Sequence, residues 1–226
     1  MTIKKYKELI KFNISLLVIV TSYIGYYLGL RSKNIYMVEY ESWIILFYLL
    51  FGTFISSSGA GVMNQCIEKD FDANMERTRN RPIPNKDISL FHAFILGFLL
   101  CLFGPLFLIY FVNLLTGVIS FITIFIYLFI YTPLKRYTSL NTIIGSIPGA
   151  LPPVGGWAAA TGTITSESLM LFGVLFCWQM PHFLSLAIIY KDDYKKAGFK
   201  MLPSVSKNLD STLFQIIFFV MALIVS

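Results

Sequence analysis

The stretch Asn64-Gln-Cys-Ile-Glu-Lys-Asp-Phe-Asp-Ala-Asn-Met-Glu-Arg-Thr-Arg-Asn-Arg-Pro82 follows directly on an uncharged run at 43–63. Within it, Asn64, Glu68 and Asp72 are four residues apart, a step that drifts only about 40° at roughly 100° per helical residue. The spacing therefore predicts a helix on which these three side chains share one face, while Asp70 points to the opposite side. One amide and two carboxylates in a row beside an apolar segment are costly without a partner.

Composition indicates that this row lies at a membrane boundary. The chain has 226 residues, of which 56% are hydrophobic and only 13% charged, whereas soluble domains average about 25% charged residues. Runs long enough to span a bilayer occur near 10–30, 43–63, 90–111, 114–132, 141–161 and 168–190, and another begins at Thr212 and is still apolar at Ser226. We expect an all-α, polytopic transmembrane helical bundle, with residues 1–226 as a single membrane-embedded domain. We also expect it to be truncated in its seventh helix, with further C-terminal helices missing.

The distribution of basic residues predicts the topology. Apart from Arg31 and Lys33, all of the 18 Lys and Arg residues fall in four segments, which are the N-terminal tail up to Lys11, 69–86, 135–136 and 191–207. Lys and Arg are enriched in cytoplasmic loops, so the N-terminus and both acidic loops should be cytoplasmic. The net charge of +6 suits anionic lipid headgroups, and no motif indicates nucleic-acid binding.

A second polar segment, Trp178-Gln-Met-Pro-His-Phe-Leu-Ser-Leu-Ala-Ile-Ile-Tyr-Lys-Asp-Asp-Tyr194, runs out of the last complete span. Gln179 and His182 fall within a narrow helical arc, and as intramembrane polar residues they should face the interior or a cavity. The arc ends in Asp192 and Asp193, which could meet the row at 64–72 across a cytoplasmic pocket. The Gly- and Pro-rich run at 145–157 predicts a broken helix, of the kind that occurs where backbone lines a cavity or small residues permit close packing.

Oxygen ligands in a row are what Mg²⁺ prefers, and it often brings substrate phosphates with it. A metal–phosphate site is therefore our interpretation of residues 64–72. The rival interpretation is a solvated, charge-mixed connector, and Asp70 fits that description better than a ligand. Lys135 and Arg136 could equally serve as topology anchors, and His182 could be satisfied by a neighbouring helix.

Three passages together resemble the UbiA superfamily of intramembrane prenyltransferases. The first is Asn64-xxx-Glu68-xxx-Asp72 followed by Arg77-Thr-xx-Arg81-Pro; the second is Tyr131-Thr-x-x-Lys-Arg-x-Thr138 with Gly-Ala-x-Pro-Pro-x-Gly-Gly-Trp157. The third, Trp178-Gln-x-Pro-His-Phe183 with Asp193-Tyr194, resembles the haem-modifying members. The match spans residues 60–205. Two departures are Glu68, where the superfamily usually has Asp, and the number of spans, since the family resembles a nine-helix bundle.

The resemblance implies Mg²⁺-dependent transfer of the farnesyl group of farnesyl diphosphate to a vinyl group of protohaem IX, with water addition, giving haem O. It implies catalytic roles for Asn64, Glu68, Asp72 and Asp193, and metal binding by Asn64, Glu68, Asp72, Asp192 and Asp193. The leaving diphosphate would be bound by Arg77, Arg81, Lys135 and Arg136, and the haem by His182 and Gln179. The setting would be the cell (inner) membrane, with association to a terminal oxidase or haem A synthase.

Two other classes of function stay open from the sequence. A membrane transporter or non-catalytic haem-handling protein could carry the same charged mouth, but transporters place ionisable residues near the bilayer midplane on broken helices. Here the acidic residues lie at predicted helix ends. A sister prenyltransferase acting on an aromatic quinone precursor is the other alternative, and the motif from Trp178 to His182 argues against it only through resemblance.

Overall fold

The computed structural model describes residues 3–37, 39–206 and 208–225, and in these residues it contains helices and no strand. The helices in chain order are α1 Ile3–Leu9, α2 Phe12–Ser32, α3 Tyr40–Asp72, α4 Leu90–Phe111, α5 Leu114–Phe125, the π-helical η1 Ile126–Tyr131, α6 Thr132–Leu134, α7 Asn141–Thr161, α8 Ser166–Ile189, α9 Lys191–Lys196, α10 Leu202–Val205 and α11 Asp210–Val225. Each expected span is helical, although 114–132 is divided among α5, η1 and the start of α6, and the all-α bundle is confirmed.

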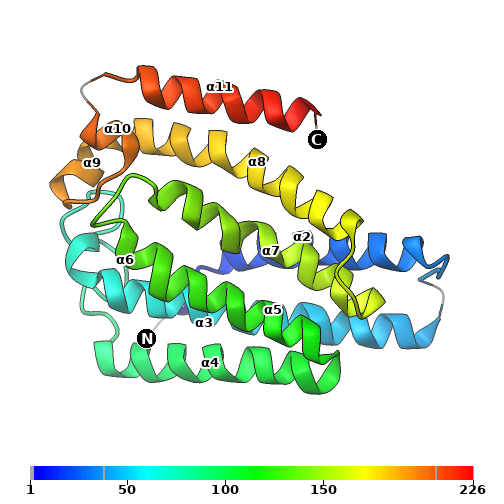
Figure 1. Ribbon diagram of the computed structural model, residues 1–226. Coiled ribbons are helices and arrows are strands. Elements are labelled where there is room, and N and C mark those ends of the chain that lie inside the picture. Colours follow the sequence, from blue (N-terminus) through cyan, green and yellow to red (C-terminus); the bar gives the residue numbers. More distant parts are fainter. Residues whose placement is uncertain (1–2, 38, 207, 226) are drawn as a thin grey trace.

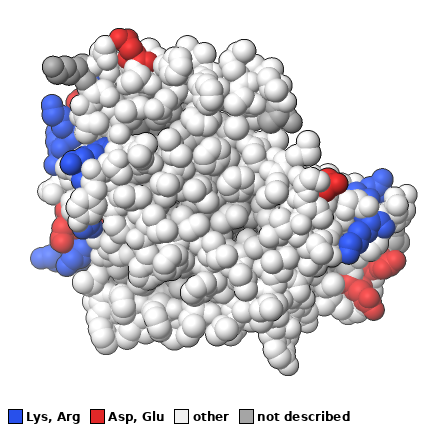
Figure 2. Space-filling view, viewed as in Figure 1, with Lys and Arg blue, Asp and Glu red and all other residues white. Residues whose placement is uncertain are grey.

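The long helices lie roughly side by side (Figure 1). Going round the bundle, α4 packs on α3, α3 on α2, α2 on α7, α7 on α5 and α5 back on α4, while α8 packs on α7 and α11 on α8. Within the described residues, five stretches are long and apolar enough to cross a membrane, which are α2, α3, α4, Leu114–Leu134 and α8. Figure 2 shows the charged side chains gathered at the two ends, with an uncharged band over the helices between. The protein is therefore an integral membrane protein.

The helix α3 is longer than a bilayer requires. Its 33 residues extend about 50 Å at 1.5 Å per residue, against a hydrocarbon core of about 30 Å. The helix therefore continues beyond the uncharged run at 43–63 as far as Asp72, and this extension carries the polar row. At the same end of the bundle lie α6, α9 and α10 (Figure 1).

The Gly- and Pro-rich run forms one continuous helix, α7, so close packing rather than a broken helix explains its composition. A Cβ atom on Gly25 of α2 would lie 1.9 Å from the Pro153 carbonyl oxygen, and one on Gly156 would lie 1.9 Å from the Ser22 carbonyl oxygen. Inside a membrane, where lipid is as apolar as a helix face, such backbone-to-backbone contact is the main source of attraction between helices. The pairing of α2 with α7 is thereby a close backbone contact between two neighbouring helices of the bundle.

Candidate active site

The row predicted on α3 is present, and it is buried. Asn64, Glu68 and Asp72 are 1%, 3% and 0% exposed, so their shared face turns into the protein. The Asp70 side chain is 84% exposed, as its position on the opposite side of the helix predicts. Two carboxylates inside the protein need compensating charge, because an unpaired buried ion is costly.

Each member of the row is held by its own cation. The Lys11 Nζ atom donates to Asn64 Oδ1 at 2.6 Å, and the Lys135 Nζ atom lies 2.8 Å from Glu68 Oε1. An Arg81 guanidinium nitrogen lies 2.9 and 2.7 Å from the two carboxylate oxygens of Asp72. Three cationic side chains are therefore paired with the three oxygen-bearing side chains of the row. This arrangement can bind a polyanion, a divalent cation, or both together.

Sequence reasoning missed Lys11 as a site residue, because in the sequence it indicates only topology. Its backbone is left-handed, with φ 49° and ψ 49°, at the junction of α1 and α2. A non-glycine residue in this conformation is uncommon, and such residues cluster at functional sites. Gln65 fixes the junction, since its Nε2 atom donates to the carbonyl oxygens of Glu8 at 3.0 Å and Leu9 at 2.9 Å. The only available signal in the sequence was the position of this lysine, one residue before the apolar run that forms α2.

The surroundings of Lys11 and Lys135 shift the pKa values of these two lysines in opposite directions. Burial, aided by the neighbouring charge of Arg81, lowers the pKa of Lys11 to about 7. Burial also acts to lower the pKa of Lys135, but the Glu68 carboxylate more than offsets it, so that pKa is raised above its usual value. Lys135 is therefore a permanent cation beside Glu68.

The π-helical turn η1 brings further groups to the row. The Tyr127 hydroxyl lies 3.4 Å from Lys11 Nζ, and the Tyr131 ring centroid lies 4.6 Å from Lys135 Nζ. Asn64 Nδ2 donates to Thr132 Oγ1 at 3.2 Å. Single π-turns occur mostly at functional sites because they re-aim side chains. Here the turn supplies aromatic faces and a hydroxyl to the buried cluster.

The remaining predicted cations have other partners. Arg136 donates to the Ile67 carbonyl oxygen at 3.2 Å, and its guanidinium lies 4.1 Å from the Phe71 ring centroid. Arg77 is exposed and lies over the Tyr190 ring, 4.6 Å from its centroid. Arg136 thus packs against the helix that carries the row, and Arg77 packs against the second acidic segment.

The second acidic segment meets the loop after α3 rather than the row itself. Asp193 accepts hydrogen bonds from the backbone nitrogens of Glu76 and Arg77. Asp192 is exposed. Further along α8 toward the membrane, Gln179 is 5% exposed and donates to the Leu175 carbonyl oxygen.

The expectation that both polar residues of α8 face the interior holds for Gln179 but not for His182. The His182 side chain is exposed and stacks on the Trp178 ring, with centroids 5.3 Å apart and an interplanar angle of 15°. The two residues are four positions apart, which is close to one helical turn, so their rings lie on the same outer stripe of α8. That stripe offers a flat aromatic surface with an imidazole beside it.

The row offers oxygen ligands suited to Mg²⁺, from two carboxylates and one amide. Among the described residues no three His, Cys, Asp or Glu side chains gather as a metal site; the row has two carboxylates and one amide. Buried carboxylate and amide oxygens along one face fit a hard divalent cation. The same oxygens accept from Lys11, Lys135 and Arg81, so a metal would share or take over these contacts.

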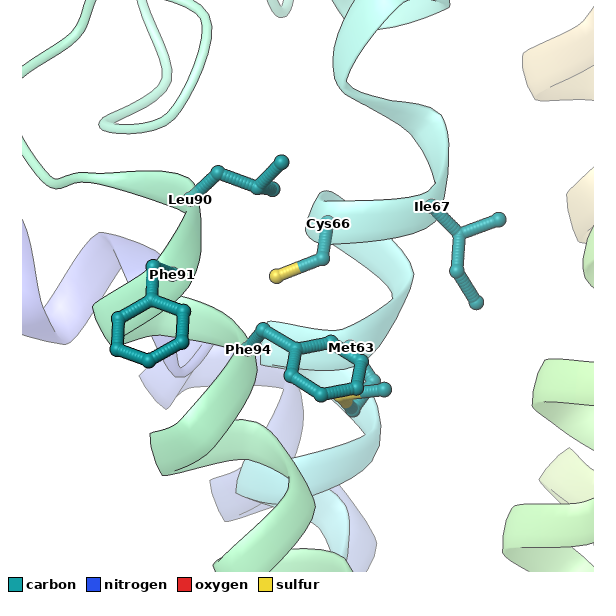
Figure 3. Close-up of a pocket in the computed structure, with 6 residues that line it drawn as sticks. All are labelled: Met63, Cys66, Ile67, Leu90, Phe91 and Phe94. Atoms are coloured by element: carbon teal, nitrogen blue, oxygen red, sulfur yellow. The ribbon is translucent and has the colours of Figure 1, made fainter.

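A surface pocket lies apart from this cluster, on the side of α3 that faces α4. It has a volume of about 530 Å³ between α3 and α4, and its lining is Met63, Cys66, Ile67, Leu90, Phe91 and Phe94. Figure 3 shows the Cys66 sulfur pointing toward α4 across this space. No charged side chain lines it. The pocket therefore differs in character from the polar cluster on the inner face of α3.

Comparison with known proteins gives a consistent result. A model of the UbiA prenyltransferase family matches residues 17–226. A protoheme IX farnesyltransferase from Solibacter usitatus is 41% identical over 223 residues, which cover 98% of this chain and 76% of that protein. A protein of the same name from Koribacter versatilis is 37% identical over 217 residues, covering 96% of this chain and 69% of that protein.

Solved structures share the fold. A digeranylgeranylglyceryl phosphate synthase superposes with a TM-score of 0.77 at 18% identity, covering 98% of this chain and 75% of that one. A UbiA homologue from Archaeoglobus fulgidus, bound to GPP and Mg²⁺, superposes with a TM-score of 0.72 at 15% identity, covering 96% of this chain and 76% of that one. At these identities the likeness establishes the bundle architecture.

Proposed function

Because the chain belongs to the UbiA prenyltransferase family, we propose that it transfers the farnesyl group of farnesyl diphosphate to a vinyl group of protohaem IX. Water adds in the same reaction, and the products are haem O and diphosphate. The observation that carries the proposal is the buried row of Asn64, Glu68 and Asp72, each member paired with a cation. The names of the relatives support protohaem as the acceptor, and residues 1–226 would act as one domain.

The reaction begins with cleavage of the bond between the farnesyl carbon and the diphosphate oxygen. The bonding electrons leave with the diphosphate, whose charge Lys11, Arg81 and Lys135 can receive, Arg81 with its planar fork of donors. Mg²⁺, held by Asn64, Glu68 and Asp72 with Asp192 and Asp193 reaching from the second loop, would supply further neutralisation of the diphosphate. Arg136 supports the same end of α3.

The farnesyl fragment is then an allylic cation. The rings of Tyr127 and Tyr131, whose centroids lie 5.6 Å apart, are placed beside the row and can stabilise positive charge. The vinyl group of the haem attacks this cation, water adds to the carbon left electron-poor, and one proton is lost to solvent. Exclusion of bulk water until that step favours transfer over hydrolysis.

The membrane setting determines how the substrates arrive. The tail and loops that carry most Lys and Arg lie at the end of the bundle that holds the row, which supports a cytoplasmic N-terminus and cytoplasmic acidic loops in a cell (inner) membrane. Farnesyl diphosphate can then present its headgroup from the cytoplasm and its tail to lipid. Haem O serves terminal oxidases, so the proposal includes association with a terminal oxidase or with haem A synthase.

The test is a transfer assay on membranes that contain the protein, supplied with farnesyl diphosphate and protohaem and analysed by mass spectrometry. We expect haem O, and no haem O after the divalent cations are chelated. Prenylation of an aromatic quinone precursor instead of protohaem would replace the acceptor in the proposal. Haem binding without any prenyl transfer would indicate a haem-handling protein.

His182 provides the test of where the acceptor binds. We propose that haem uses the outer stripe of α8, with His182 as a ligand or orienting group and Gln179 behind it. His182→Ala should then reduce haem binding and acceptor turnover about ten-fold or more, and leave Mg²⁺-dependent binding of farnesyl diphosphate unchanged. His92→Ala is the matched control, because His92 is also exposed and its hydrogen bonds to Ser89 and its ring contact with Phe91 are local to the start of α4. Normal haem binding by the His182 variant would remove this residue from the proposal.

A further inference from the structure

The loop after α3 and the segment around α9 are joined, although more than a hundred residues separate them in the chain. The two Asp193 carboxylate oxygens accept from consecutive backbone nitrogens, Oδ1 from Glu76 at 3.4 Å and Oδ2 from Arg77 at 3.2 Å. Figure 1 shows the loop after α3 reaching α9 at this end of the bundle. Each oxygen retains a lone pair, so Asp193 can join the loops and still face a metal.

The Arg77 side chain completes the connection from the other direction. Its guanidinium lies 4.6 Å from the Tyr190 ring centroid and 5.8 Å from that of Tyr194, and it donates to the Tyr194 hydroxyl at 3.3 Å. A planar, weakly hydrated guanidinium stacks on aromatic rings better than a lysine ammonium does. The two tyrosines therefore form a specific receptor for Arg77 in the second acidic segment.

The contacts of Asp193 and Arg77 lie beside a buried apolar cluster. Under the two segments lies an apolar cluster of buried residues, which are Met75, Ala187, Ala197, Phe199 and Met201. The outer pair of Glu76 and Lys196, with side chains 69% and 57% exposed, adds little, because exposed ion pairs are weak. The stable part of the connection is thus Asp193, Arg77 and the two tyrosine rings above the cluster.

The same loop carries two members of the site. Asp72 precedes Arg77 by five residues and Arg81 follows it by four, and the Thr78 hydroxyl donates to the Asp72 carbonyl oxygen at 2.9 Å. The place where Arg77 docks therefore sets where Arg81 meets Asp72. We infer that Arg77 is a positioning residue, which fixes both acidic loops in register through Tyr190 and Tyr194 rather than binding the diphosphate. The inference rests on the proposed function for the reaction that it supports.

Hydrogen–deuterium exchange on the full chain in detergent tests the connection without any substrate. Tyr190→Leu removes a ring face and should raise amide exchange across 73–82 several-fold, whereas Tyr190→Phe keeps the ring and should match the parent protein. Arg77→Lys keeps the charge but loses the stacked plane, and it should raise exchange as Tyr190→Leu does. Exchange in α4, far from the connection, reports whether each variant is folded.

Transfer kinetics then separate positioning from diphosphate binding. The positioning role predicts that Arg77→Lys and Tyr190→Leu each lower kcat roughly five-fold, that the double variant is no worse than either, and that Tyr190→Phe restores the parent rate. Affinity for inorganic diphosphate with Mg²⁺ should change little in all of them. Full activity and unchanged exchange in Tyr190→Leu, or weakened diphosphate binding confined to Arg77 variants, would overturn the inference. If no variant and no parent protein transfers farnesyl, the proposed function fails, and the exchange data still decide whether the two loops are connected.

Discussion

Asp72 binds Arg81 through both of its carboxylate oxygens, which lie within 3 Å of one Arg81 nitrogen. The carboxylate is fully buried, and the Arg81 side chain is 28% exposed. Removing the charge of Asp72 would leave Arg81 without its partner and remove an oxygen donor from the row. Asp70, two residues away, has the same chemistry on the solvent side.

We expect Asp72→Asn to lower farnesyl transfer about a hundred-fold, because it removes the charge that would hold Mg²⁺ and Arg81 at the diphosphate, and contacts to charged groups contribute up to about 3 kcal/mol. Asp70→Asn should stay within about two-fold of the parent rate, as expected for an exposed side chain. Rates of transfer in membranes measure both, with thermal unfolding in detergent as the check on folding. Equal effects of the two substitutions would contradict a role for the buried face.

Lys11 offers a second residue-scale prediction. Its backbone is left-handed at the junction of α1 and α2, beside the Glu8 and Leu9 carbonyl oxygens to which Gln65 donates, and its amine donates to Asn64. Lys11→Met should weaken Mg²⁺-dependent binding of inorganic diphosphate at least ten-fold, since a charged contact to phosphate contributes about 1.5–3 kcal/mol. Lys4→Met, at an exposed position of α1, removes the same charge and should have no measurable effect. Isothermal titration on both variants makes the comparison.

At the scale of elements, the sequence predicted what local periodicity can encode. The face shared by Asn64, Glu68 and Asp72 follows from 3.6 residues per turn within one helix, and the spans follow from hydropathy. The partners of the row do not follow, because Lys11 and Lys135 arrive from other helices and only the packed bundle brings them together. The continuity of α7 was also out of reach. Three prolines in one segment favour a break, and only the close approach of α2 shows why the helix persists.

That approach gives an element-scale prediction. Gly25→Ala would place a methyl group against the Pro153 carbonyl oxygen, and the helices would have to separate. Overpacking of this kind costs roughly 1–3 kcal/mol, so the thermal midpoint in detergent should fall. Gly173→Ala in α8 is the matched control, since nothing lies within 4 Å of its added methyl group and helices favour Ala over Gly. A stable Gly25 variant would mean that α2 and α7 are less tightly joined.

At the scale of the whole molecule, the site requires both acidic loops on one side of the membrane. Asn74 and Lys196 flank the connection between those loops, and Tyr36 lies in the turn between α2 and α3 at the other end. Single cysteines at 74 and 196, in a background without the native thiols, should react with an impermeant maleimide from the cytoplasmic side. A cysteine at 36 should react from the other side. Labelling of 74 and 196 from opposite sides would rule out a shared site.

Of the helices with more than twenty residues in the described part of the chain, α7 alone is absent from those apolar enough to cross a membrane by themselves. Its glycines and prolines lower its partition from water into lipid, yet they are the residues that admit α2 to backbone contact. Helix α2 emerges from the ribosome first, so it is already in the bilayer when α7 is synthesised. Insertion of α7 is then coupled to its packing on α2, because contact with α2 replaces contact with lipid along the Gly- and Pro-rich face of α7. Because α2 is synthesised before α7 and packs closely on it, insertion of α7 into the membrane depends on the earlier insertion of α2.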